Sequence, residues 1–140
     1  MIRVCPNCQQ KNRVAARHVV SPARCGKCRS ALPPPSEPID ADTALFDEVV
    51  GEAPVRVLVD FWAGWCAPCR RAAPEVARAA AETAGRAVVL KVDTEAHPDL
   101  AARYQVQSIP NFVVLSGRRV VVQQPGLVPS VQLVAWLTAS

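Results

Sequence analysis

Six cysteines form three Cys-x-x-Cys pairs whose surroundings differ. Cys66 and Cys69 follow an apolar run and precede an alanine-rich stretch, which suits a reactive dithiol. The other two pairs lie in a polar, basic segment near the N-terminus, which suits a metal. Their members are Cys5, Cys8, Cys25 and Cys28. The sequence therefore predicts two kinds of sulfur chemistry in one chain.

The spacing of Cys66 and Cys69 fits dithiol–disulfide exchange. One thiolate attacks a disulfide, and the second thiol must be close enough to resolve the mixed disulfide. We expect Cys66 at the N-terminus of a helix, exposed as the nucleophile, because free N–H groups and the helix dipole favour a negative sulfur there. Cys69 would be shielded about one turn further in. Pro68 suits the first turn, where its missing N–H would have no partner.

Two charged residues interrupt apolar runs that read as buried strands. Asp60 lies within residues 57–62, and a buried carboxylate has a raised pKa unless it is paired. Such a group can exchange a proton with Cys69 near neutral pH. Lys91 interrupts the next apolar run and is a possible partner of Asp60. The alternative is that one or both side chains point outward at the end of a strand.

The N-terminal cysteines have the spacing of a zinc ribbon. Sixteen residues separate Cys8 from Cys25, and four thiolates at this spacing bind one tetrahedral Zn²⁺. Gly26 allows the backbone to approach the sulfurs closely. Because the segment has little apolar mass, we expect it to fold only when the metal binds. The competing interpretations are a pair of redox disulfides and a zinc ion released on oxidation.

Charge is unevenly distributed along the chain. Residues 1–36 hold seven Lys and Arg and no acid, whereas the rest holds nine Lys and Arg against twelve Asp and Glu. A basic head can contact nucleic acid, but this one has no aromatic residue to stack on bases. Nearby cations also balance a site in which four thiolates surround one Zn²⁺. We therefore expect no nucleic-acid partner.

The elements that position these residues follow from periodicity and turn signals. Prolines at residues 33–38 predict an extended spacer between a zinc-ribbon-like domain, 1–32, and a second domain, 39–140. In the second domain, helices and apolar runs alternate, which predicts an α/β fold with a mixed central sheet flanked by helices. The expected helices cover 44–50, 66–84, 98–104 and 129–138. The expected strands cover 55–62, 87–93, 111–116 and 119–124, the last two forming a hairpin.

The sequence offers no membrane or export signal. No apolar run approaches the roughly 18 residues that span a bilayer. The N-terminus also lacks the apolar stretch of a secretory signal. We therefore expect a cytoplasmic monomer without a membrane partner, in a compartment where thiols stay reduced.

Residues 59–70 (VDFWAGWCAPCR), followed by Ser108-Ile109-Pro110 before a strand, resemble the thioredoxin family over residues 39–140. The four-cysteine head resembles the zinc-carrying, two-domain bacterial members of the thioredoxin 2 type. The resemblance implies a thioredoxin fold and a protein-disulfide reductase in which Cys66 attacks, Cys69 resolves and Asp60 is the buried acid–base group. It also implies a cis Ile109–Pro110 peptide facing the dithiol. The substrate groove would be bordered by Trp65, Ala67, Pro68, Ile109, Pro110 and Gly126.

The same resemblance implies oxidised proteins as substrates and an NADPH-dependent thioredoxin reductase as electron donor. The chain has no nucleotide-binding Gly-rich loop, so we expect flavin and nicotinamide to belong to that partner. Two positions depart from the family: Ala67 replaces the usual Gly, and Asn111 the usual Thr. Two other functions stay open, a zinc-dependent binding module and a redox-sensing zinc switch on a thioredoxin scaffold.

Overall fold

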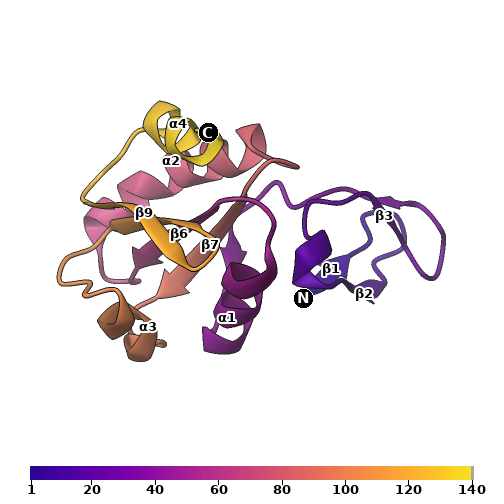
Figure 1. The fold of residues 1–140 in the computed structure, drawn as a ribbon, viewed down its shortest axis with the longest axis horizontal. Helices are drawn as coiled ribbons and strands as arrows, with labels where there is room; N and C mark the ends of the chain where they lie inside the picture. The colour runs from indigo at the N-terminus through magenta and orange to yellow at the C-terminus, as the bar shows by residue number, and fades with distance from the viewer. Residues whose placement is uncertain (140) are drawn as a thin grey trace.

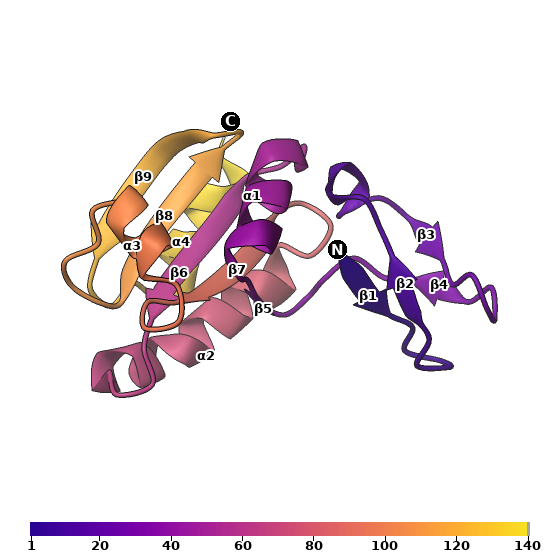
Figure 2. The same cartoon turned by 90° about the horizontal axis from the view of Figure 1, so that it is seen from below.

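The structure is a computed structural model that describes residues 1–139; Ser140, the last residue of the predicted second domain, lies outside the described residues. Its larger part is a five-stranded mixed sheet with helices on both faces (Figures 1 and 2). The strands are ordered β5-β7-β6-β8-β9. Their bounds are β5 Ile39–Asp40, β6 Val57–Trp62, β7 Val88–Asp93, β8 Asn111–Ser116 and β9 Arg119–Pro125. The helices are α1 Thr43–Glu52, α2 Ala67–Glu82, α3 Pro98–Arg103 and α4 Ser130–Thr138.

Side-chain alternation in β6 divides the core into two layers. Val57, Val59 and Phe61 face the layer that contains α1 and α3, whereas Leu58 faces the layer that contains α2 and α4. Asp60 has the same parity as Leu58, so it lies on the α2 side. Because both faces of β6 are covered, the strand is nearly all apolar, and this makes Asp60 conspicuous.

The predicted α/β fold is confirmed, with differences at the ends of elements. The helix expected over 66–84 begins at Ala67, with Cys66 as its N-cap, and ends at Glu82. The strand expected from residue 55 begins at Val57. Strand β5 was not predicted, because two residues show no period. It is defined by parallel backbone pairing with β7, which places Asp40 opposite Lys91.

Residues 1–32, which we call the head, form two small hairpins. Strand β1, Ile2–Val4, pairs with β2, Lys11–Arg13, and β3, Ala23–Arg24, pairs with β4, Ala31–Leu32. These strands were too short to be predicted from periodicity. The core of the head itself consists of Cys5, Cys25 and Leu32.

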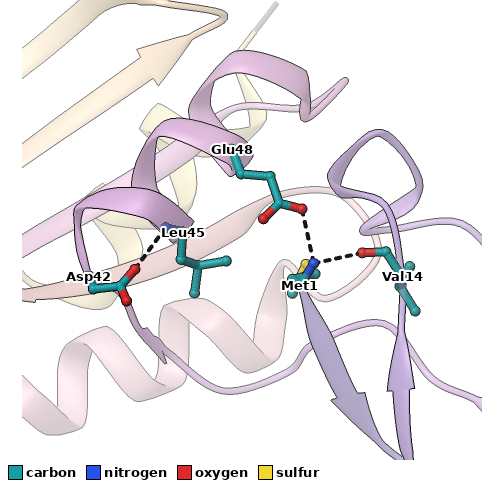
Figure 3. A network of polar contacts seen from close by, with 5 residues as sticks. All are labelled: Met1, Val14, Asp42, Leu45 and Glu48. Carbon is teal, nitrogen blue, oxygen red and sulfur yellow. Dashed lines mark hydrogen bonds and ion pairs between the residues drawn. The ribbon is translucent and has the colours of Figure 1, made fainter.

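The head packs on α1 of the larger part. Its 3-10 helix η1, Ala16–His18, lies beside α1, and Ala16 and Val19 are fully buried in the core that contains Val49 of α1. At the same junction the Met1 ammonium donates to the Val14 carbonyl at 2.9 Å and to Glu48 at 2.9 Å (Figure 3). The head therefore shares a hydrophobic core with the sheet.

Within residues 1–139, every helix is too short or too polar to cross a bilayer.

Candidate active site and metal centre

Cys66 and Cys69 lie at the start of α2. Their sulfurs are joined in a disulfide, with Cα atoms 5.2 Å apart. Cys66 is the N-cap, and its Sγ accepts a hydrogen bond from the Cys69 backbone N–H at 3.1 Å. Pro68 occupies the first turn, as expected. Free N–H groups and the helix dipole therefore act on the Cys66 sulfur, which stabilises a thiolate when the disulfide is reduced.

The expectation of an openly exposed Cys66 is not met in this disulfide-bonded state. The relative exposure of Cys66 is 2% and that of Cys69 is 6%. The two cysteines differ instead in where they lie. Cys66 lines a cavity of about 490 Å³ and Cys69 does not line it. The Cys66 side of the disulfide therefore faces this cavity.

Four of the residues expected in the substrate groove line the same cavity. They are Trp65, Ala67, Pro68 and Ile109. The Ile109–Pro110 peptide bond is cis, and the Ile109 carbonyl oxygen lies 3.7 Å from the Cys66 Sγ. Gly126, with φ of +90°, donates its N–H to the Pro110 carbonyl at 2.8 Å. Pro110 follows the cavity-lining Ile109 in the chain, and Gly126 is bonded to Pro110. Both therefore lie beside the cavity, although neither lines it.

Glu95 is a site residue that the sequence analysis missed. Trp65 is 68% exposed, and its indole Nε1 donates to Glu95 Oε1 at 2.9 Å. Both residues follow the carboxyl ends of neighbouring parallel strands, where Trp62 pairs with Asp93. Residues just beyond paired strand ends lie close together, so the predicted strands already contained the signal for this contact.

Asp60 is buried, with 3% of its surface exposed, in the middle of β6. Its Oδ1 has no hydrogen-bond partner within the described part of the chain. Burial raises the pKa of the Asp60 carboxyl to about 7, and the charge of Lys91 opposes this increase. A carboxyl with this pKa can be either protonated or ionised near neutral pH.

Lys91 pairs in register with Asp60, but its ammonium lies elsewhere. The Nζ atom is 4.5 Å from the centroid of the Trp62 ring, a cation–π contact. No ion pair joins Lys91 to Asp60 among residues 1–139 within 4.0 Å. Lys91 therefore acts on Asp60 through space rather than by direct pairing.

The second group of cysteines converges in the head. The sulfurs of Cys5, Cys8, Cys25 and Cys28 all lie within 4.8 Å of one another. Two of the separations, from Cys5 to Cys28 and from Cys8 to Cys25, are 3.6 Å. A tetrahedral site with Zn–S bonds of about 2.3 Å has edges of about 3.8 Å. The four sulfurs thus have the dimensions of a thiolate metal site.

Hydrogen bonds around the sulfurs favour thiolates, but not on all four at once. Bonds from Ser30, then from Asn7, lower the pKa of Cys28 to about 5. The pKa of Cys8 is raised to about 11: a backbone bond from Gln10 lowers it, but desolvation and the other three thiols outweigh that bond. Four thiolates this close repel one another, so full ionisation requires a cation among them. The donor set therefore fits a soft divalent metal.

Two asparagines hydrogen-bond to the loops that carry the four cysteines. Asn12 Nδ2 donates to the Cys25 Sγ at 3.6 Å, and Asn12 Oδ1 accepts from the Gly26 N–H at 2.9 Å. Asn7 Nδ2 donates to the Cys28 Sγ at 3.5 Å. The sequence analysis did not assign these residues, and only Asn7, between Cys5 and Cys8, had a position that signalled a contact.

Comparisons with known proteins give a consistent result. A sequence model of the family described as Thioredoxin matches residues 37–139. Thioredoxin C-3 of Corynebacterium nephridii is 37% identical over 137 residues, which are 98% of this chain and 93% of the relative, so that match includes the head. Thioredoxin 1 of Chlorobaculum tepidum is 39% identical over 88 residues, which are 63% of this chain and 87% of the relative.

Two solved structures share the fold. A mutant thioredoxin from Halobacterium salinarum superposes with a TM-score of 0.67 at 31% identity, covering 74% of this chain and 89% of that one. A chloroplastic thioredoxin z superposes with a TM-score of 0.66 at 26% identity, covering 72% of this chain and 91% of that one.

Proposed function

The chain belongs to the thioredoxin family of thiol–disulfide oxidoreductases, and we propose that it reduces disulfides in proteins through Cys66 and Cys69. The observation that carries the proposal is the position of Cys66. It caps α2, accepts a backbone N–H bond at 3.1 Å and lines the cavity beside the cis Ile109–Pro110 peptide. A thiolate at this position is both stabilised and within reach of an extended substrate.

The reaction has two exchange steps. The Cys66 thiolate attacks one sulfur of a substrate disulfide, and the other substrate sulfur leaves as a thiolate and is protonated. Cys69 then loses its proton and attacks the Cys66 Sγ, which forms the Cys66–Cys69 disulfide and releases the second substrate thiolate. The substrate gains two electrons and two protons, and the enzyme becomes the disulfide seen in the structure.

Asp60 is our candidate for the group that accepts the Cys69 proton, because its pKa of about 7 suits transfer near neutral pH. Lys91 favours the charged form of Asp60 through space. We assign substrate contacts to Trp65, Ala67, Pro68, Ile109, Pro110 and Gly126. The electrons for the next cycle would come from an NADPH-dependent thioredoxin reductase, as is general in the family.

We further propose that the four head cysteines hold one Zn²⁺, which would supply a structural crosslink between two hairpins that otherwise share a core of three residues. In this proposal residues 1–32 are a zinc domain, 33–38 a linker and 39–140 the redox domain. A reducing compartment such as the cytoplasm would suit both sites, because neither thiol set would then be held oxidised.

Reduction of insulin disulfides tests the main proposal. Cys66→Ser should reduce turnover to background, whereas Cys69→Ser should accumulate a mixed disulfide with substrate that mass spectrometry detects. Retained turnover in Cys66→Ser would refute the assignment. Asp60→Asn should slow the resolving step near neutral pH, and equal resolving rates from about pH 6 to 9 would remove Asp60 from the mechanism.

Zinc analysis separates the role of the head from that of the dithiol. We expect one zinc ion per chain, bound equally by wild type and by Cys66→Ser. Loss of zinc at peroxide levels that leave Cys66 and Cys69 reduced would instead favour the redox-sensing switch. Zinc binding with no insulin turnover would favour a binding module on a thioredoxin scaffold.

A further inference from the structure

Residues 33–38, which we call the connecting segment, contain no helix or strand but are held at both ends. Arg3 is only 7% exposed, and its Nη2 donates to the Leu32 carbonyl at 2.7 Å and also to the Pro33 carbonyl. At the other end, Ile39 pairs with Leu90, and the Ala41 N–H donates to the Lys91 carbonyl at 2.9 Å. One anchor thus belongs to the head and the other to the sheet.

Between these anchors the connecting segment forms one wall of a cavity over Asp60. The cavity has a volume of about 330 Å³, room for several water molecules. Glu37 and Pro38 of the connecting segment line it, as do Ala73, Val76 and Ala77 of α2. The remaining lining residues are Asp40, Asp60 and Lys91.

The register of the sheet explains why Asp60 faces this cavity. Asp40 of β5 pairs with Lys91 of β7, which pairs with Asp60 of β6. Residues paired in register point to the same side of a sheet, so the three side chains form a row under α2. Among residues 1–139 Asp60 Oδ1 has no hydrogen-bond partner, and the cavity is the opening through which water would reach it.

The charges facing Asp60 come from three elements. They are Lys91 from β7, Asp40 from β5 and Glu37 from the connecting segment. The α2 residues that line the cavity are all apolar, and β8 places Phe112 opposite Asp60. Cys66 and Cys69, at the start of α2, do not titrate in the disulfide-bonded state. The connecting segment therefore supplies both one of the nearby charges, Glu37, and part of the wall beside the carboxyl.

We propose that Arg3 and Pro38 are positioning residues for Asp60: Arg3 fastens the connecting segment to the head, and Pro38 holds the wall that limits the access of water and protons to the carboxyl. The head would thus act on the redox chemistry through the chain that joins it to the sheet, without contact with the dithiol. This inference rests on the proposed function only for the catalytic role of Asp60.

The sign of the effect follows from solvation. If the wall opens, water stabilises the carboxylate, and the pKa of Asp60 moves from about 7 towards the ordinary value of 3.8. The fraction of Asp60 that is protonated then falls about tenfold, at a pH above both values, for each unit that the pKa falls. The pH profile of the resolving step should move in the same direction.

The test is a ¹³C NMR titration of the Asp60 carboxyl in the oxidised full-length protein. The resonance is assigned by its absence in Asp60→Asn. We expect Arg3→Gln and Pro38→Gly each to lower the pKa of Asp60 by about one unit. Hydrogen exchange of the Ala41 amide, measured in parallel, reports whether β5 stays paired with β7.

Arg17→Gln is the matched control, because Arg17 is also a cation of the head but is exposed. It should titrate as wild type. Arg3→Lys keeps the charge but replaces the planar guanidinium, whose donor directions are fixed, with a freely rotating ammonium, so it should show an intermediate shift. It replaces Arg3→Gln if that variant fails to fold. An Asp60 titration unchanged in the Arg3 variant, or unchanged in Pro38→Gly, overturns the proposal.

Insulin turnover of the wild type is measured on the same samples. Absent turnover with the expected Asp60 shifts would refute the proposed function and leave this inference standing. Normal turnover with unshifted Asp60 would refute the inference alone.

Discussion

At position 60 the chain places a carboxyl group beneath α2. The residue is 3% exposed, and one carboxyl oxygen has no hydrogen-bond partner in the part of the chain that the structure describes. The folded protein therefore favours the protonated form, and ionisation opposes folding. Val or Leu at this position would suit the packing of β6 better. The retention of an acid here is understandable as a requirement of the chemistry rather than of the fold.

The stability of Asp60→Asn should depend on pH in a defined direction. Because the pKa of Asp60 is raised, its burial costs wild type no stability below about pH 4, where the carboxyl is protonated in both folded and unfolded states. The free energy of unfolding then falls progressively up to about pH 7, and above that pH the whole cost of ionising the buried carboxyl is present. The difference between about 7 and 3.8 corresponds to roughly 4 kcal/mol at most. Asn cannot ionise, so the free energy of unfolding of the variant should increase relative to that of wild type as the pH rises.

Urea denaturation of the oxidised proteins at pH 4 and pH 8 measures this gain, with Glu82→Gln, which alters an exposed carboxyl in the last turn of α2, as the control. A difference between variant and wild type that is the same at both pH values would show that Asp60 is solvated and that its burial does not set its ionisation.

At the scale of elements, α1 connects the head to the sheet. One side of it contributes Phe46 and Val49 to the core under the sheet, and the same core receives Val19 from the head. Its N-terminus is capped by Asp42, whose Oδ1 accepts from the Leu45 N–H at 2.8 Å (Figure 3). Because α1 packs on both the head and the sheet, a substitution that destabilises α1 should destabilise both parts.

Asp42→Ala should lower the free energy of unfolding by about 1 kcal/mol, because it leaves the N–H of the first turn without its side-chain acceptor. Asp42→Ser keeps an acceptor and should stay within a few tenths of a kcal/mol of wild type. Thermal unfolding of both variants measures the effect. Equal stability of the Ala and Ser variants would mean that the cap contributes nothing at this position.

At the scale of the whole molecule, the head lies beside α1 and β5, towards the C-terminal end of α2, while the end that Cys66 caps points away (Figure 2). Its side chains Met1, Ala16 and Val19 are part of the larger core, yet its own core has three residues. We therefore expect the metal to stabilise both parts of the chain.

Removal of the proposed zinc ion by a chelator under reducing conditions should unfold the head. It should also lower the free energy of unfolding of the larger part by roughly 2 kcal/mol or more, the contribution of one buried Val side chain and its neighbours. Tryptophan fluorescence reports this selectively, because Trp62, Trp65 and Trp136 all lie outside the head. Val19→Ala in the metal-loaded protein should reproduce part of the loss. Unfolding of the tryptophan-containing part at the same urea concentration with and without metal would contradict the coupling.

Much of this protein could be predicted from the sequence because the relevant signals are local. The cap position of Cys66, the apolar strand around Asp60 and the two Cys-x-x-Cys pairs of the head are each set by residues within a few positions of one another. Such patterns depend on helix and strand periods and on the chemistry of sulfur, which act over short stretches of chain. They were sufficient to predict the α/β fold, the position of Cys66 at the start of a helix and the convergence of the four head cysteines.

Only the tertiary structure decided which distant residues meet. Three contacts join parts of the chain that share no periodic pattern: the bonds from Arg3 to the start of the connecting segment, the position of Lys91 over Trp62 and the burial of Val19 beside α1. Such contacts arise from the register of the strands and from how two preformed surfaces pack. Short strands such as β5 exist only because a neighbouring strand offers backbone groups to pair with, and no sequence period encodes that.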